Sequence, residues 1–149
     1  NFYDPRAPIY THARFLPGST VEASELRDVL IAEGCQIRKA QITHSIVGIR
    51  SQIAEGTVIK NSILMGADYY QTFEEMRDDL VVGKPRVGIG EGTVISRAII
   101  DKNARIGKNV RLVNEASVVE ADGADGAYYI RDGIIIVPKN ALVADGTVV

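Results

Sequence analysis

Aliphatic residues recur about every six positions along much of this chain, with turn-forming residues between them. Three segments align without gaps: residues 31–42 (IAEGCQIRKAQI), 53–64 (IAEGTVIKNSIL) and 89–100 (IGEGTVISRAII). Shorter copies of the same hexad fill residues 100–105, 106–111, 137–142 and 143–148. Each hexad opens on Ile or Val, usually carries Gly or Asn at its fourth position, and has a small or β-branched residue fifth.

This repeat predicts a parallel β-helix, a coil with flat sides whose aliphatic columns point inward. The fourth position needs positive φ at the turn, which Gly and Asn tolerate, and it is occupied by Gly34, Gly56, Gly92, Asn103, Asn109 and Asn140. An antiparallel β-sandwich also has short strands and frequent turns, but it would not repeat one hexad in register. Crossovers between parallel strands are normally right-handed, so this general rule does not predict a left-handed coil. We expect the left-handed coil because the repeat resembles that of hexapeptide-repeat proteins.

Two segments interrupt the repeat. Residues 65–86 contain Thr72 and Glu75 in a capping-box arrangement, followed by apolar residues at helical spacing, and end at Gly83 and Pro85. They predict one short inserted helix that packs one face on the solenoid. Residues 114–133 form an acidic loop with Asp-Gly turns.

The composition mainly excludes certain classes of partner and location. A net charge of −2 argues against nucleic acid as a partner, and no apolar run approaches the roughly 20 residues that cross a bilayer. The polar opening, without a signal peptide, is typical of the interior of a longer protein. The one cysteine, Cys35, cannot form an internal disulfide, which is compatible with a reducing compartment.

Most candidate catalytic residues have a structural interpretation. The glycines of residues 88–92 coincide with hexad turn positions, so they do not indicate a nucleotide-binding loop. His44 lies within a repeat segment and has no carboxylate neighbour, although some hexapeptide acyltransferases use a histidine as general base. Cys35 occupies a small corner position, and no group of residues has metal-ligand spacing.

The basic residues are more informative. Residues 97–111 carry five cations against Asp101 alone: Arg97, Lys102, Arg105, Lys108 and Arg111. Three lysines (Lys102, Lys108 and Lys139) occupy the third position of a hexad, each directly before Asn. Equivalent positions of stacked coils share an edge of the solenoid, so these ammonium groups are predicted to converge on one anion. The alternative is that exposed turns carry charge for solubility.

Three longer segments carry a resemblance that covers the whole chain: residues 2–17 (FYDPRAPIYTHARFLP), 45–72 (SIVGIRSQIAEGTVIKNSILMGADYYQT) and 98–110 (AIIDKNARIGKNV). They resemble the C-terminal domain of the ADP-glucose pyrophosphorylase (glucose-1-phosphate adenylyltransferase) family, and most closely its cyanobacterial and plant type. MGADYY and IIDKNARIG are the specific motifs, since the hexads alone are common to other hexapeptide proteins.

The resemblance implies a left-handed β-helix at residues 21–149, preceded by an interdomain linker and first strand at residues 1–20, with the N-terminal catalytic domain absent. The parent enzyme would make ADP-glucose and pyrophosphate from ATP and glucose 1-phosphate with Mg²⁺, for glycogen or starch synthesis. This fragment would have no cofactor and no activity of its own. It would help to assemble a homo- or hetero-tetramer in the bacterial cytoplasm, or in a plastid, and would respond to 3-phosphoglycerate and phosphate.

Carried over by motif, the activator-site lysines fall on Lys102 and Lys139, and an arginine linked to phosphate inhibition falls on Arg14. Arg105 and Lys108 would be further anion contacts. Asp132 and Pro138 depart from the family pattern, and Asp132 would add negative charge near the site. Two alternatives stay open: an acyltransferase with a catalytic histidine, and a solenoid that serves assembly only.

Overall fold

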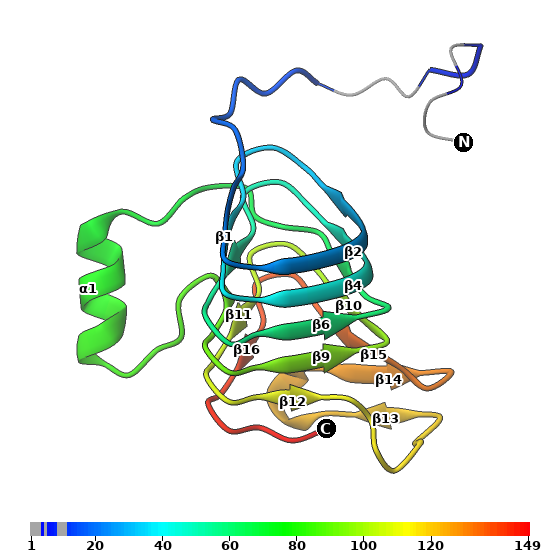
Figure 1. Cartoon of the computed structure of the whole chain (residues 1–149). Coiled ribbons are helices and arrows are strands. Elements are labelled where there is room, and N and C mark those ends of the chain that lie inside the picture. Colours follow the sequence, from blue (N-terminus) through cyan, green and yellow to red (C-terminus); the bar gives the residue numbers. More distant parts are fainter. Residues whose placement is uncertain (1–3, 5, 9–11) are drawn as a thin grey trace.

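A computed structural model describes residues 4, 6–8 and 12–149, so part of the predicted linker (residues 1–3, 5 and 9–11) lies outside the described residues. The chain forms a left-handed parallel β-helix whose coils stack from the N-terminal to the C-terminal end (Figure 1). Each coil has three sides joined by tight corners. The predicted fold class is therefore confirmed.

The first side is a six-stranded parallel sheet, and each of its strands opens a new coil. In spatial order, its strands are β1 (Thr20–Glu22), β3 (Gln36–Arg38), β5 (Gln52–Ile53), β8 (Gly88–Ile89), β11 (Arg105–Ile106) and β16 (Leu142–Val143).

The second and third sides form one continuous sheet, because β2 (Glu25–Ile31) and β4 (Gln41–Val47) run across the corner between them. The second side continues through β6 (Val58–Lys60), β9 (Val94–Ser96) and β12 (Arg111–Leu112). The third side continues through β7 (Ile63–Leu64), β10 (Ala98–Ile100) and β15 (Ile134–Val137).

The hexad explains the core, because the first residue of each hexad points inward and stacks on its equivalent in the next coil. One column runs through Ile37, Ile53, Ile89, Ile106 and Val143, and all five side chains are buried. The other two sides contribute matching columns of buried Ile, Leu and Val. Burying each such side chain stabilises the fold by about 1.5–3 kcal/mol.

The corners also follow the hexad. All six predicted fourth-position residues, from Gly34 to Asn140, have positive φ. The glycines of residues 88–92 serve the stacking, because a Cβ on Gly90 would lie 2.3 Å from the Gly107 carbonyl oxygen in the next coil. Gly90 and Gly92 lie in the turn that follows β8, as predicted, whereas Gly88 is a residue of the strand itself.

The first insertion carries helix α1 (Phe73–Val81), which has the predicted capping box between Thr72 and Glu75. The prediction that it packs one face on the solenoid is wrong: no residue of the helix is buried, and Phe73 is 90% exposed. Figure 1 shows α1 standing clear of the coils. Polar contacts hold the insertion instead, through the side chains of Gln71 and Asp79.

The second insertion is a hairpin rather than a plain loop. Strand β13 (Ala121–Asp122), a single 3₁₀ turn η1 (Ala124–Gly126) and β14 (Tyr129–Arg131) lead back antiparallel to β15. Within the described residues, no helix is long and apolar enough to span a membrane.

Candidate anion-binding site

The corner between the third and first sides is a continuous edge held by one backbone ladder. From the N-terminal end, the amides of Gly34, Arg50, Ala67, Asn103 and Asn140 each donate to a carbonyl of the preceding coil, at 2.9–3.1 Å. We call this corner the lysine edge, because Lys102 and Lys139 lie on its last two steps. Residues that are far apart in sequence are brought into register here.

Lys102 and Lys139 lie one coil apart on this edge, since the Asn140 amide donates to the Lys102 carbonyl at 3.0 Å. Their ammonium groups meet at the carboxylate of Asp68. Lys102 Nζ lies 3.0 Å from Asp68 Oδ1, and Lys139 Nζ lies 3.0 Å from Asp68 Oδ2. The side chain of Lys102 is 28% exposed, that of Lys139 52% and that of Asp68 40%. Solvent therefore reaches the cluster. Two cations therefore share one anion at the surface.

Asn103 fixes the position of Asp68. Its Oδ1 accepts the Asp68 backbone amide at 2.8 Å, and its Nδ2 donates to Asp68 Oδ2 at 3.1 Å and to Asn140 Oδ1 at 3.2 Å. Hydrogen bonds from Lys102, then Lys139 and then Asn103, hold the pKa of the Asp68 carboxyl well below its usual range. Asp68 is thus ionised and firmly held at neutral pH.

Asp68 is the residue of this site that the sequence did not indicate. It belongs to the first insertion, outside the hexads, so its position on the lysine edge could not be predicted by counting hexad positions. The one available signal was its position within the MGADYY motif.

Lys108 does not join the pair. It lies on the corner between the first and second sides, where Nζ is 3.5 Å from Glu91 Oε2 and its backbone amide donates to Asp145 Oδ1 at 2.8 Å. We call this corner, with Glu55, Glu91, Lys108 and Asp145, the acidic edge. The expectation that Lys102, Lys108 and Lys139 share one edge is therefore wrong for Lys108.

Arg105 is occupied by a structural contact. Its Nη1 lies 2.6 Å from Asp79 Oδ2 and donates to the Pro85 carbonyl at 2.8 Å, in a pair that is only about 15% exposed. It also holds the pKa of Asp79 below the usual value, as the first of several causes. This contact joins the far end of α1 to the coils.

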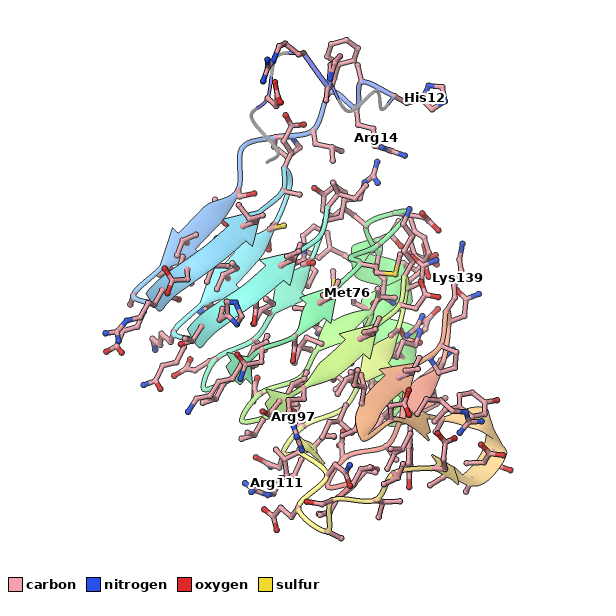
Figure 2. All side chains as sticks on the ribbon, turned by 90° about the vertical axis from the view of Figure 1, so that its right-hand side faces the viewer. His12, Arg14, Met76, Arg97, Arg111 and Lys139 are labelled. Carbon is pink, nitrogen blue, oxygen red and sulfur yellow. The ribbon has the colours of Figure 1, made fainter. Side chains whose placement is uncertain are left out.

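Arg14 lies beyond the first coil, at the opposite end of the lysine edge from Lys139 (Figure 2). The edge begins at Pro17, whose carbonyl accepts the Gly34 amide, and four coil spacings separate Pro17 from Asn103. Arg14 precedes Pro17, so at about 4.8 Å per coil it is separated from Lys102 by roughly 19 Å along the axis. The structure brings the two lysines together and leaves Arg14 apart from them.

Asp132 also lies away from the lysines. It precedes β15, whereas Lys139 follows that strand, so the strand's length separates them. Its amide donates to Glu120 Oε1 at 3.3 Å. Asp68, rather than Asp132, supplies the negative charge at the lysine edge.

The remaining candidates have structural surroundings. His44 is a corner residue with φ of 46°, and its Nδ1 lies 2.9 Å from the Asn61 amide oxygen. Its hydrogen-bond partner is an amide and not the carboxylate that commonly orients a catalytic histidine. Burial raises the pKa of the Cys35 thiol, which keeps it protonated. Residues 4, 6–8 and 12–149 contain no cluster of potential metal ligands.

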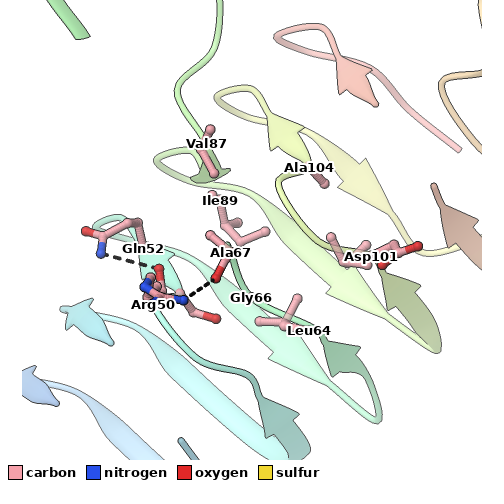
Figure 3. A pocket seen from close by; sticks show the side chains of 12 residues that line it. Arg50, Gln52, Leu64, Gly66, Ala67, Val87, Ile89, Asp101 and Ala104 are labelled. Carbon is pink, nitrogen blue, oxygen red and sulfur yellow. Dashed lines mark hydrogen bonds between the residues drawn. The ribbon is translucent and has the colours of Figure 1, made fainter. Parts of the chain in front are cut away.

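A small cavity lies beneath the start of the first insertion (Figure 3). Its lining is mostly apolar, including Leu64, Ala67, Ile89 and Ala104. Arg50 also lines it and donates to the Ala67 carbonyl at 3.2 Å. It has no convergent set of polar groups that could orient a substrate.

The stacked hexads and the positive-φ corners define a left-handed hexapeptide-repeat solenoid. More specifically, the family model described as the GLGC left-handed parallel beta-helix domain matches residues 14–148. The chain therefore belongs to this domain family, which is that of the ADP-glucose pyrophosphorylases, a group of nucleotidyltransferases.

Proposed function

We propose that this chain is the regulatory and assembly domain of an ADP-glucose pyrophosphorylase of the cyanobacterial and plant type, and that its lysine edge binds a small phosphorylated anion. The observation that carries this proposal is the convergence of Lys102 and Lys139 on one carboxylate, at 3.0 Å each. A site that holds one anion between two ammonium groups has the charge and spacing that a phosphoryl group requires.

The proposed parent enzyme makes ADP-glucose and pyrophosphate from ATP and glucose 1-phosphate, with Mg²⁺, for glycogen or starch synthesis. Its chemistry belongs to an N-terminal catalytic domain, and the β-helix contributes to a homo- or hetero-tetramer. The effectors are 3-phosphoglycerate as activator and phosphate as inhibitor. Arg14 is a further proposed phosphate contact, made where the linker meets the catalytic domain. This role is separate from the lysine pair, given its position beyond the first coil.

The test is a titration of the full-length protein with inorganic phosphate and with 3-phosphoglycerate, for wild type, Lys102→Ala and Lys139→Ala. Each variant should weaken binding by about tenfold, because it removes one of two charge-assisted contacts, and basal activity should persist.

Lys39→Ala is the matched control. Lys39 also pairs with a carboxylate at 3.0 Å, that of Glu55, but it lies on the other corner. The control should bind like wild type. Equal affinities for all four proteins would contradict the proposed site.

A further inference from the structure

We infer that Asp68 is an internal competitor that sets the selectivity of the lysine edge: dianionic phosphoryl groups displace its carboxylate, whereas simple monocarboxylates do not. This inference rests on the proposed anion-binding function and identifies how that site distinguishes its ligands.

The two lysines of the edge are already occupied by an anion of the chain itself. Both oxygens of Asp68 are used, Oδ1 by Lys102 and Oδ2 by Lys139 and Asn103, at 3.0–3.1 Å. These contacts form a bridge between the two ammonium groups. An external anion that bridges the same groups must therefore take the place of this carboxylate.

The charge of an incoming anion decides whether it can displace Asp68. Exchanging Asp68 for a dissolved monocarboxylate replaces one charge of −1 by another. Asp68 has the advantage, because it is part of the chain and its backbone amide is held by Asn103 at 2.8 Å. Intrachain groups of this kind act at effective concentrations of about millimolar or more. A phosphomonoester carries about −1.5 to −2 at neutral pH and presents three acceptor oxygens, so it gains more from the two lysines than Asp68 does.

The Asp68 carboxylate is also one of the anchors of the first insertion. Asp68 begins the segment that continues to Tyr70, whose hydroxyl donates to the Gly34 carbonyl at 2.7 Å, and then to α1. Ala67 stays fixed through Arg50 on the preceding coil. Release of the Asp68 carboxylate therefore frees one anchor of the insertion while Arg105 still holds its far end at Asp79. Anion binding is thereby coupled to the anchoring of α1.

The decisive variant is Asp68→Asn in the full-length protein, titrated with inorganic phosphate at pH 8 and separately with acetate. Loss of the competing charge should tighten phosphate binding about tenfold, on the scale of two partly exposed ion pairs, and should make acetate binding measurable. Hydrogen exchange of residues 68–72 should rise on phosphate binding in wild type, and should start high in the variant.

Asp101→Asn is the matched control. Asp101 lies beside Lys102, but its carboxylate accepts a hydrogen bond from the Lys102 backbone amide, at 2.6 Å, and not from the Lys102 ammonium group. It removes the same charge from the same edge and should change phosphate affinity less than about twofold. Asp68→Ser gives a second route to the same result if the asparagine variant folds poorly.

The outcomes separate the two proposals. If wild type binds phosphate through Lys102 and Lys139 but Asp68→Asn binds it no more tightly, the competitor inference is wrong and the anion site stands. If Asp68→Asn tightens binding no more than Asp101→Asn does, only the total charge matters and the inference is also wrong. If neither wild type nor Asp68→Asn binds phosphate, both proposals fail.

Discussion

The two corners that flank the first side are built from the same hexad but carry opposite charge arrangements. On the acidic edge, the Lys108 ammonium group lies 3.5 Å from Glu91 of the preceding coil, and the Lys108 backbone amide donates to Asp145 of the following coil at 2.8 Å. On the lysine edge, Lys102 and Lys139 are stacked directly and share Asp68 alone. Both corners are held by the same kind of backbone ladder between coils, but the first insertion leaves the stack at the lysine edge and supplies Asp68 there. Under the proposed function, a lysine in a hexad turn is therefore not an anion ligand by itself, and an adjacent second lysine is also required.

One hydrophobic core supports both edges, so a substitution in this core should have the largest effect on stability. Ile95 is fully buried in the column of the second side. Ile95→Ala should lower the free energy of unfolding by about 2–5 kcal/mol through lost burial and a residual cavity. Denaturant titration measures the change, and Ile63→Ala, at an outward-facing position that is 41% exposed, should cost far less. A similar loss in both variants would contradict the assigned inward columns.

A smaller effect should follow from changing the amide that holds the lysine edge together. Asn103 is buried, has φ of 60°, and makes side-chain contacts with Asp68 and Asn140. Asn103→Ala should cost about 1–3 kcal/mol, because partners lose hydrogen bonds and alanine is strained at positive φ. Thermal unfolding measures this cost.

Asn103→Gly separates the two causes, since glycine removes the amide without the strain. It should be less destabilising than Asn103→Ala. If both variants unfold like wild type, Asn103 does not organise the edge.

The smallest effect concerns the titration of Asp68. Lys102 and Lys139 depress the folded pKa of this carboxyl, so its contribution to stability is present above its unfolded pKa and is lost as the pH falls through the folded pKa. Lys139→Ala removes one of the two ammonium groups and should move the Asp68 pKa up toward the ordinary value of about 3.9. Carboxyl NMR across an acid titration reads this directly, and Lys108→Ala serves as the control from the acidic edge. An unchanged Asp68 pKa in Lys139→Ala would mean that the shared contact does not persist in solution.

The sequence predicted most of the fold because the hexad is local and repeated. It assigned the inward columns, the positive-φ corners and the two interruptions from residue types alone. It did not determine the hand of the coil, which rested on the resemblance to hexapeptide-repeat proteins. It also gave the wrong docking for α1. The capping box is encoded locally, whereas the contacts that hold the insertion depend on Arg105, a residue of a later coil.

The juxtaposition of the two lysines could be predicted from the sequence for the same reason. Lys102 and Lys139 share an edge because their hexads occupy equivalent places in successive coils. Lys108 follows Lys102 by a single hexad, and with three hexads per coil that step leads to the neighbouring corner. Arg14 precedes the coils, so no repeat position could relate it to the lysines. Asp68 reaches the edge only through the path of an insertion, which the repeat does not encode.

A crystal structure of the full-length protein, grown with phosphate near neutral pH, would show whether Lys102 and Lys139 together hold one phosphoryl anion. We expect one phosphate between the two ammonium groups, with oxygens about 2.7–2.9 Å from each Nζ, and none at Lys108 on the acidic edge. A phosphate bound only elsewhere, or lysines still bridged by Asp68 at phosphate concentrations that alter activity, would contradict the account.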